Sequence, residues 1–335
     1  MHNLDGHTIL VTGGAGFIGS ALVRLLLDEG ATVRVVDNLV NGKRENLADL
    51  PPDAPLTLHT HDIRDADAMR ETLAGVDRVF HLACLGVRHS LHAPLENHAV
   101  NATATLNLLA LSREAGVERF IYTSTSEVYG TARTVPMTEA HPTYPMTVYG
   151  ASKLAGECYT RAYYESYGYP TVVVRPFNAF GPRSHHEGDS GEVIPKFMLR
   201  AMVGQPLVIF GDGQQTRDFT YVEDTARGIL LAGLHDGAIG QTLNIGSNAE
   251  ITIRALAETV KSVVNNPDAQ IIYDAPRPGD VLRLYADSTR AGDLLGFEPQ
   301  VSLRDGLQRL QTWYQALDIS PQTLLADEKV RNWER

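Results

Sequence analysis

The 335-residue sequence is poor in cysteine and has no long apolar run. Only Cys84 and Cys158 are present and no CxxC motif occurs, so we exclude a disulfide framework. No stretch approaches the roughly 20 apolar residues that cross a bilayer, so we expect no contact with membranes. The first residues lack a basic region followed by an apolar core, so we expect no signal peptide. These absences favour a protein of the reducing cytoplasm.

Positive charge is also scarce. The sequence has 29 Lys and Arg against 40 Asp and Glu, which gives a net charge of −11. This balance argues against a surface that binds nucleic acid or anionic membranes, but it does not exclude a local basic pocket. The length of 335 residues suits one large α/β domain or two closely joined ones, and the hydrophobic content of 43% is ordinary for a globular protein with a full core.

The first half of the chain alternates predicted strands and helices. Apolar runs predict strands at residues 7–13, 31–37, 56–63, 76–83, 117–126 and 170–178. Apolar residues at helical spacing predict helices at residues 20–30, 65–75, 93–116 and 146–168. Such alternation is typical of βαβ units, so we predict an α/β fold with a Rossmann-type doubly wound parallel sheet.

After Pro176 the alternation becomes irregular, and short strands separate further helical segments. We predict one nucleotide-binding domain at residues 1–176, rejoined by about 218–247. Residues 177–217 and 248–335 would form a smaller C-terminal α/β substrate-binding region that caps the strand ends. We expect the tail after Leu317 to be weakly attached.

Glycines mark the junction of the first strand and the first helix. Gly13, Gly16 and Gly19 form a GxxGxxG motif, and Gly14 adds a fourth glycine. In a dinucleotide site the first glycine permits a sharp turn, the second lets a pyrophosphate approach, and the third packs the helix on the strand. The free N–H groups of the helix N-terminus then face the phosphates. A turn that merely packs well is the alternative.

An acidic residue completes this pattern. Asp37 ends the second predicted strand, where a carboxylate accepts hydrogen bonds from the adenosine ribose. It would repel a 2′-phosphate, which favours NAD over NADP. Lys43 and Arg44 are counter-evidence, but we interpret them as a solvated loop pair. Because a dinucleotide accounts for the glycines and for Asp37 together, we predict that the cofactor is NAD.

A tyrosine and a lysine stand one helical turn apart in the segment "YGASK". Tyr149 and Lys153 share a helix face, and a nearby cation favours the phenolate form of tyrosine. Tyr149 is therefore a candidate base for a sugar hydroxyl. In "TSTSEVYG", at the end of the fifth strand, Thr125 is a candidate hydrogen-bond partner of the same hydroxyl. Glu127 is a candidate second acid/base, and a solvent-facing loop carboxylate is its alternative.

The order of GxxGxxG, Thr125, "YGASK" and "RPFNAFGP" resembles the extended short-chain dehydrogenase/reductase family of nucleotide-sugar epimerases, dehydratases and decarboxylases. The likeness continues through "GDGQQTRDFTYVEDTARGI" and "RPGDVLRLYADSTRAGDLLGF". It implies an enzyme whose first domain binds NAD and whose second binds a nucleoside diphosphate-sugar. It also implies a homodimer formed through the long helices.

The resemblance also assigns residues. Beside Tyr149 and Lys153 it implies cofactor contacts from Gly13, Gly16, Phe17, Ile18, Gly19, Asp37, Asn38, Asp62, Ile63, Ala83, Asn101 and Pro176. Beside Thr125 it implies substrate contacts from Asn178, Val193, Arg217, Arg277 and Asp280. Arginine suits the diphosphate because its planar guanidinium binds phosphate oxygens and stays charged.

Members of this family oxidise the sugar at C4, and the fate of the 4-keto sugar distinguishes them. A 4,6-dehydratase needs an acid/base near C5 and C6, and related dehydratases and decarboxylases carry a glutamate where this chain has Glu127. Many dehydratases have Asp where this chain has Ser126, which weakens the assignment. Because Glu127 is present, we still interpret the chain as a 4,6-dehydratase, with a 4-epimerase as the close alternative. A uronate decarboxylase is the third reading, and an NAD-binding protein without turnover ranks below all three.

Two remaining features receive modest roles. His185, His186, Glu187 and Asp189 could suggest a metal, but nothing fixes a tetrahedral set, so we predict no metal. Their loop lies where the family covers the sugar. Cys84 is interpreted as a small buried core residue, and a place beside the cofactor, after the segment "HLA", is its alternative.

Overall fold

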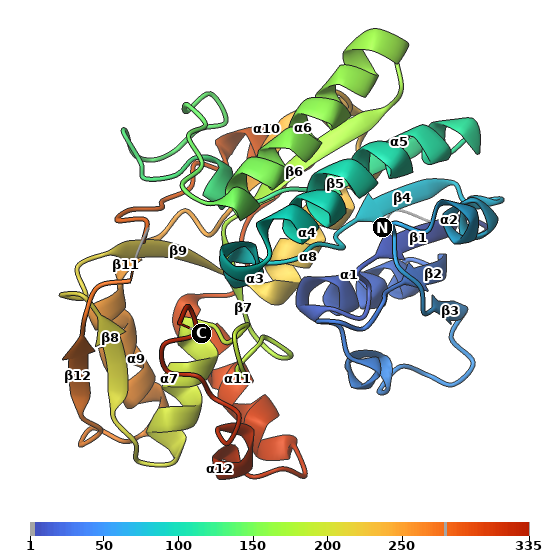
Figure 1. Cartoon of the computed structure of the whole chain (residues 1–335). Coiled ribbons are helices and arrows are strands. Elements are labelled where there is room, and N and C mark those ends of the chain that lie inside the picture. Colours follow the sequence, from blue (N-terminus) through green and yellow to red (C-terminus); the bar gives the residue numbers. More distant parts are fainter. Residues whose placement is uncertain (1–3, 278–279, 335) are drawn as a thin grey trace.

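A computed structural model describes residues 4–277 and 280–334 of the chain. The ends and the middle of the "RPGD" segment, residues 278–279, lie outside the described residues. Figure 1 shows a large region built on one sheet and a smaller region that contains most of the second half of the chain. None of the described helices combines the length and apolar character that crossing a bilayer would require.

The large sheet has seven strands, all parallel, which confirms the predicted Rossmann-type doubly wound fold. The strand order is β10-β6-β5-β4-β1-β2-β3. The central strands are buried on both faces, which explains their continuous apolar runs. In spatial order the strands are β10 (Thr242–Ile245), β6 (Thr171–Pro176), β5 (Arg119–Thr123), β4 (Arg78–His81), β1 (Thr8–Thr12), β2 (Thr32–Val36) and β3 (Leu56–His59).

Helices cover both faces of this sheet (Figure 1). Two helices that pack on each other cover one face, α1 (Phe17–Asp28) and α8 (Val222–Leu234). The helices of the other face are α2 (Ala66–Leu73), α5 (Ala104–Glu114) and α6 (Val148–Tyr167).

The helix predicted at residues 93–116 is interrupted. It consists of α4 (Pro94–His98), a π-helical turn η2 (Ala99–Thr103) and α5. A short helix that the sequence did not predict, α3 (Val87–His92), precedes it. π-Helical turns inside α-helices are frequent at functional sites, and this one carries Asn101.

The smaller region has two sheets and a hydrophobic core of its own. Its strands are β7 (Asn178–Phe180), β8 (Leu207–Phe210), β9 (Thr216–Tyr221), β11 (Glu250–Thr252) and β12 (Ile271–Asp274). Its helices are α7 (Val193–Met202), α9 (Ile253–Val264), α11 (Leu303–Ala316) and α12 (Pro321–Leu324). The remaining elements are α10 (Thr289–Leu295) beside β10 and the 3-10 turns η1 (Arg44–Leu47), η3 (Ser126–Val128) and η4 (Asp236–Ala238).

The C-terminal tail is attached firmly, so the expectation of weak attachment after Leu317 is wrong. Helix α12 packs on α7, and Leu325 belongs to the core of the smaller region. Asn332 is 1% exposed. Arg331 donates two hydrogen bonds to Asp274, at 2.9 and 2.7 Å. The sequence analysis missed this attachment because the polar residues that anchor the tail form no recognisable pattern.

Candidate active site

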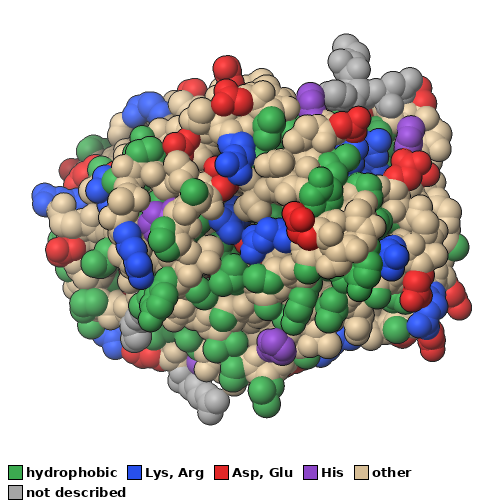
Figure 2. Space-filling model, turned by 90° about the horizontal axis from the view of Figure 1, so that it is seen from above, with side chains coloured by type: hydrophobic (Ala, Val, Ile, Leu, Met, Phe, Trp, Pro, Cys, Tyr) green, Lys and Arg blue, Asp and Glu red, His purple; other side chains and the backbone are tan. Residues whose placement is uncertain are grey.

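A cavity of about 980 Å³ lies where the carboxyl ends of the parallel strands face the smaller region. Ligands bind at this edge in open α/β sheets, because loops and helix N-termini converge there. Every residue that the sequence analysis assigned to cofactor, catalysis or substrate lines this cavity except Asn101. In Figure 2 acidic side chains lie among the lysines and arginines of the face shown, so that face is not uniformly basic.

The glycine motif forms a tight cradle at the start of α1. Gly13 has φ +73°, and a Cβ there would stand 2.7 Å from the backbone nitrogen of Ala83. A Cβ on Gly19 would overlap the carbonyl oxygen of Gly13. Gly16 is the N-cap of α1 and makes no side-chain cap, so the helix N-terminus is left for a ligand. This backbone therefore fits the pyrophosphate of a dinucleotide.

Asp37 lies at the end of β2 beside this cradle. Its carboxylate accepts the N–H groups of Ala15 at 3.0 Å and Leu39 at 2.9 Å. These bonds fix its orientation, and each oxygen keeps a lone pair for a ribose hydroxyl. Burial raises the pKa of Asp37. A Cβ on Gly42 would stand 2.6 Å from its oxygens, so the neighbouring loop is closely fitted to this carboxylate.

The basic pair behind Asp37 has other partners. Lys43 forms an ion pair with Glu187 of the smaller region, and Arg44 donates to Thr60 at 2.8 Å. Both residues are exposed, as the sequence suggested, but each side chain has a partner within the chain. At the adenine end, Asn38 donates to Asp62 at 2.9 Å. Hydrogen bonds from Arg64 hold the pKa of Asp62 at about 2.

Tyr149 and Lys153 come from the first two turns of α6, which begins at the side-chain cap of Thr147. Burial raises the pKa of the Tyr149 hydroxyl well above its usual value, and nearby Thr125 opposes this rise. The Lys153 ammonium is 2% exposed and donates to the carbonyl of Thr123 at 2.6 Å. Among the described residues no hydrogen bond joins Lys153 to the Tyr149 hydroxyl. The chain alone therefore keeps Tyr149 as a neutral phenol.

Asn101 lies behind the cavity wall. Its amide accepts the N–H of Leu85 at 2.8 Å and donates to the Leu85 carbonyl at 2.9 Å. It also donates to Ser152 of α6 at 3.2 Å and to Asn97 at 3.2 Å. Asn101 therefore fixes the loop after β4 against the helix of Tyr149, and does so without facing the cavity.

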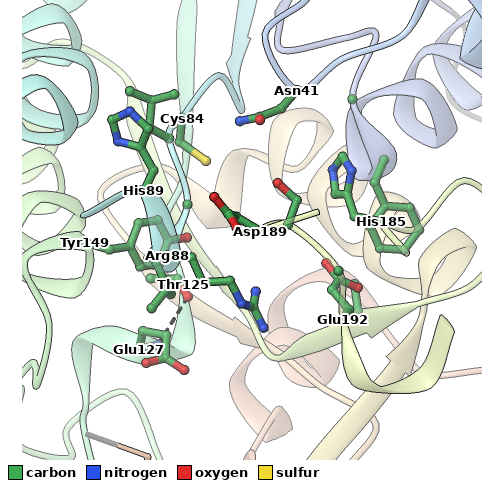
Figure 3. Close-up of a pocket in the computed structure, with 18 of the residues that line it drawn as sticks. Asn41, Cys84, Arg88, His89, Thr125, Glu127, Tyr149, His185, Asp189 and Glu192 are labelled. Atoms are coloured by element: carbon green, nitrogen blue, oxygen red, sulfur yellow. Dashed lines mark hydrogen bonds between the residues drawn. The ribbon is translucent and has the colours of Figure 1, made fainter. Parts of the chain in front are cut away.

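Glu127 is directed into the cavity rather than toward solvent (Figure 3). Its backbone N–H donates to the Thr125 hydroxyl at 3.2 Å. Burial raises the pKa of the Glu127 carboxyl, while the positive charges of Arg217, Arg277 and Arg88 oppose this rise. A carboxyl group with a raised pKa in a cavity is suited to both taking and giving a proton.

Arg88 was missed by the sequence analysis. It comes from α3, and its guanidinium points toward Glu127 and Glu192 (Figure 3). No hydrogen bond or close ion pair holds it within the described part of the chain. Its position after β4, at the ligand-binding edge of the sheet, was the available signal. Burial raises the pKa of Glu192, another missed residue, to about 6.

The predicted diphosphate contacts lie in the smaller region or at its boundary. Arg217 donates to Asp280 at 2.7 Å, so Asp280 orients this guanidinium. Among residues 4–277 and 280–334, the buried side-chain oxygen of Asn178 has no hydrogen-bond partner, and neither has Nε of Arg277. Such unpaired buried groups are costly unless a ligand or water completes them. The arrangement fits an anionic substrate with polar oxygens.

The loop between β7 and α7 covers one side of the cavity. His185 and Asp189 line it, as Figure 3 shows, whereas Glu187 points to Lys43. Within residues 4–277 and 280–334, no group of three or more His, Cys, Asp and Glu could hold a metal ion.

Cys84 corrects an expectation. It is half-buried, lines the cavity and lies beside Tyr149, where it contributes to the raised pKa of the hydroxyl. It is therefore a wall residue of the site rather than a core residue. Its place directly after Ala83 at the end of β4 brings it there.

A buried ion pair anchors the helix of Tyr149. Glu157 of α6 is 0% exposed and Arg175 of β6 is 3% exposed. Arg175 donates to the two carboxylate oxygens at 2.8 and 2.6 Å. It also donates to the Tyr129 hydroxyl at 2.8 Å, which in turn donates to Asn244 of β10 at 2.7 Å. This network joins α6 to the sheet directly behind the cavity.

Comparison with known proteins agrees with this site. The family model for GDP-mannose 4,6 dehydratase matches residues 10–310. A putative UDP-glucose 4-epimerase of Methanocaldococcus jannaschii is 36% identical over 91% of this chain and 97% of its own length. UDP-glucuronic acid decarboxylase 1 of Arabidopsis thaliana is 36% identical over 90% of this chain and 68% of its own length.

A solved structure extends the likeness to three dimensions. DesIV of Streptomyces venezuelae, a dTDP-glucose 4,6-dehydratase solved with NAD bound, is 35% identical. It superposes with a TM-score of 0.86 over 92% of this chain and 97% of its own. The chain belongs to the extended short-chain dehydrogenase/reductase family of NAD-dependent nucleotide-sugar enzymes. This family contains epimerases, dehydratases and decarboxylases.

Proposed function

We propose that the chain is an NAD-dependent nucleoside diphosphate-sugar 4,6-dehydratase in which Glu127 is the second acid/base. The cofactor is NAD. A bound oxidised NAD would supply a hydride acceptor for C4 of the sugar and a positive charge that favours the phenolate form of Tyr149. The residues that would hold it are the glycine cradle, Asp37 and Lys153.

The chain supplies the proton transfers. Tyr149 takes the proton of the C4 hydroxyl, which Thr125 orients. The resulting C4 carbonyl makes the C5 proton acidic, and Glu127 takes that proton. Glu127 then gives it to the C6 hydroxyl, which leaves as water, so that a 4-keto-5,6-ene remains. The hydride removed from C4 would return to C6 while C5 takes a proton from solvent through Glu127, which gives a 4-keto-6-deoxy sugar and restores the oxidised cofactor. The observation that carries this proposal is the buried Glu127 carboxyl with its raised pKa, because a 4-epimerase needs no acid/base beyond the tyrosine.

Arg88 favours a second candidate, a uronate decarboxylase. The Arg88 guanidinium lies near Glu127 and has no hydrogen-bond partner in the described part of the chain, so it suits a carboxylate on C5 of the sugar. In that reaction the 4-keto sugar loses carbon dioxide, and Glu127 would supply the proton that replaces it at C5.

The test uses Glu127→Gln, which keeps the shape of the side chain but removes the base. The wild-type protein is incubated with UDP-, GDP-, CDP- and dTDP-hexoses and hexuronates in deuterium oxide, and products are analysed by mass spectrometry. We expect loss of water with deuterium at C5, and a rate at least about 100-fold lower in the variant. Glu165→Gln, an exposed change on α6, is the matched control.

The other outcomes separate the readings. Loss of carbon dioxide from a hexuronate would refute the dehydratase assignment and establish a decarboxylase. An isomer of unchanged mass without deuterium at C5, formed at nearly the normal rate by Glu127→Gln, would establish an epimerase.

Three broader expectations accompany this function. Residues 1–176 with about 218–247 would bind NAD, and residues 177–217 with 248–335 would bind the nucleotide sugar. We place the enzyme in the cytoplasm because both cysteines are free thiols. We also propose a homodimer through α5 and α6, whose outer faces lie side by side in Figure 1. Light scattering that gives the mass of one chain would contradict the dimer.

A further inference from the structure

The end of the chain returns to the cavity. After α12 the residues 325–334 run along the smaller region, and Glu328, Val330 and Trp333 line the cavity wall. The C-terminal segment, defined here as residues 327–334, therefore reaches the site from a part of the sequence that carries no motif of the family. Figure 1 shows the C-terminal end next to α7 and α11.

The C-terminal segment is bound to the loop that covers the sugar side of the cavity. Asn332 donates to the carbonyls of Asp189 at 3.2 Å and Gly191 at 2.9 Å. The N–H of Gly188 donates to the carbonyl of Asp327 at 2.8 Å. One of these bonds joins two main-chain groups, and the others join the buried Asn332 amide to main-chain carbonyls of the loop. The C-terminal segment and the loop therefore form one continuous wall of the cavity.

Trp333 forms an aromatic corner with Phe210. Their ring centroids are 4.5 Å apart with the planes at 86°. The guanidinium carbon of Arg277 lies 5.1 Å from the centre of the Trp333 ring and 5.5 Å from that of Phe210. Both distances fall within the range of cation–π attraction, which is strongest for tryptophan.

Arg277 has no carboxylate bonded to it in the described residues. Its Nε is buried without a hydrogen-bond partner. Burial, together with the like charges of Arg88 and Arg217, lowers the pKa of Arg277 to about 10. Asp280 and Glu127 attract this guanidinium while the other two arginines repel it, and the aromatic corner adds a contact that does not occupy its N–H donors. No described residue takes a hydrogen bond from these donors, which therefore suit an anionic ligand.

We propose that Trp333 is a positioning residue, which holds Arg277 in place for the diphosphate of the nucleotide sugar. The proposal rests on the nucleotide-sugar function, but it does not depend on which reaction follows. Without the docked C-terminal segment, Arg277 would lose one aromatic face and the sugar-side loop would lose its anchor. The segment is thus a working part of the substrate site.

The test measures binding of UDP, GDP and dTDP by calorimetry, with the corresponding monophosphates and nucleosides as shorter probes. We expect Trp333→Leu to weaken the best diphosphate about tenfold or more, and to change nucleoside and NAD affinities by less than twofold. Trp333→Phe should recover most of the affinity. In steady-state assays over a range of substrate concentrations, KM should rise while kcat changes little.

A double-mutant cycle ties the effect to Arg277. Because Trp333 acts through that guanidinium, Trp333→Leu combined with Arg277→Ala should bind diphosphate no more weakly than Arg277→Ala alone. Trp313→Leu is the matched control, because this other tryptophan lies on α11 outside the cavity lining.

A fluorescence measurement covers the case in which Trp333→Leu does not fold. The chain has two tryptophans, so Trp313→Phe leaves Trp333 as the single tryptophan, which can be excited at wavelengths where tyrosine does not absorb. We expect the Trp333 emission to change as the nucleoside diphosphate binds, and the titration should give the same Kd as calorimetry.

Several outcomes overturn the proposal. These are unchanged diphosphate affinity in Trp333→Leu, additive losses in the cycle, and an emission that does not respond to diphosphate. An equal loss for the nucleoside would mean that Trp333 stacks on the base instead. If no nucleoside diphosphate binds the wild-type protein, the proposed function fails with it, whereas binding without dehydration leaves this proposal intact.

Discussion

Removing Glu157 should destabilise the enzyme strongly, although this residue does not face the cavity. The carboxylate is fully buried and bonded at both oxygens by Arg175. Glu157→Ala would leave the Arg175 guanidinium buried with a neutral tyrosine hydroxyl and a backbone carbonyl as partners. Breaking a buried pair in this way costs about 3–5 kcal/mol of unfolding free energy. At about 2 °C per kcal/mol, the melting temperature should fall by roughly 6–10 °C.

The pH dependence of the free energy of unfolding gives a second test of the Glu157–Arg175 ion pair. Burial alone would raise the pKa of Glu157, but the hydrogen bonds and charge of Arg175 outweigh it and hold the pKa below its usual range. A carboxyl whose pKa is lower in the folded state stabilises the protein above the unfolded pKa of about 4.3, and loses that contribution as pH falls through the folded value. The stability gap between wild type and Glu157→Ala should therefore shrink below about pH 4.3.

Urea denaturation and thermal melts followed by circular dichroism measure both effects. Glu165→Ala on the same helix is exposed and should change the unfolding free energy by less than about 0.5 kcal/mol. Glu157→Leu with Arg175→Met should lose far less than Glu157→Ala, because no unpaired charge remains. A loss below about 1 kcal/mol for Glu157→Ala, or a gap that is constant from pH 7 to pH 3, would refute the reasoning.

Two further predictions concern the cofactor side of the site. Tyr149→Phe removes one hydroxyl that no described residue needs for folding, so turnover should fall by about 100-fold or more while circular dichroism and NAD affinity stay unchanged; near-normal turnover would mean that another base takes the C4 proton. Calorimetry should show tighter binding of NAD than of NADP, because the buried Asp37 carboxylate repels a 2′-phosphate and Lys43 is occupied by Glu187. Equal or reversed affinities would contradict this, and Asp37→Ser should narrow the difference.

The sheet could be predicted because its signal is local. Strands such as β5 and β6 are buried on both faces, so they appear in the sequence as unbroken apolar runs between glycines and helical patterns. The break at η2 could not be predicted, because it is associated with Asn97 and Asn101, which bond the loop of Leu85. That loop is close in space but belongs to the preceding strand.

Some residues of the site could also be predicted from short motifs, whereas others could not. Gly13, Asp37 and Tyr149 belong to motifs whose spacing is short, and the structure brings them to one cavity. Trp333 reaches the cavity only through tertiary packing, and no neighbour in sequence marks it. Arg88 follows β4 at the ligand-binding edge of the sheet, but no motif marks its side chain as part of the site. The direction of Glu127 was equally open, because a loop carboxylate can face solvent or a cavity, and only the fold around η3 turns it inward.

The return of the chain to the large sheet limits how this enzyme can be divided. The polypeptide leaves the sheet at Pro176, builds β7, α7, β8 and β9, and comes back as α8 and β10 before leaving again. A fragment that ends at Pro176 would make β6 an edge strand and would uncover the face of α1 that packs on α8. The smaller region is thus built from a segment inserted between β6 and α8 together with the C-terminal part of the chain, rather than from one appended module. Exchanging it for that of a relative would require matched junctions at every crossing between the two regions, and a single fusion point would not be enough.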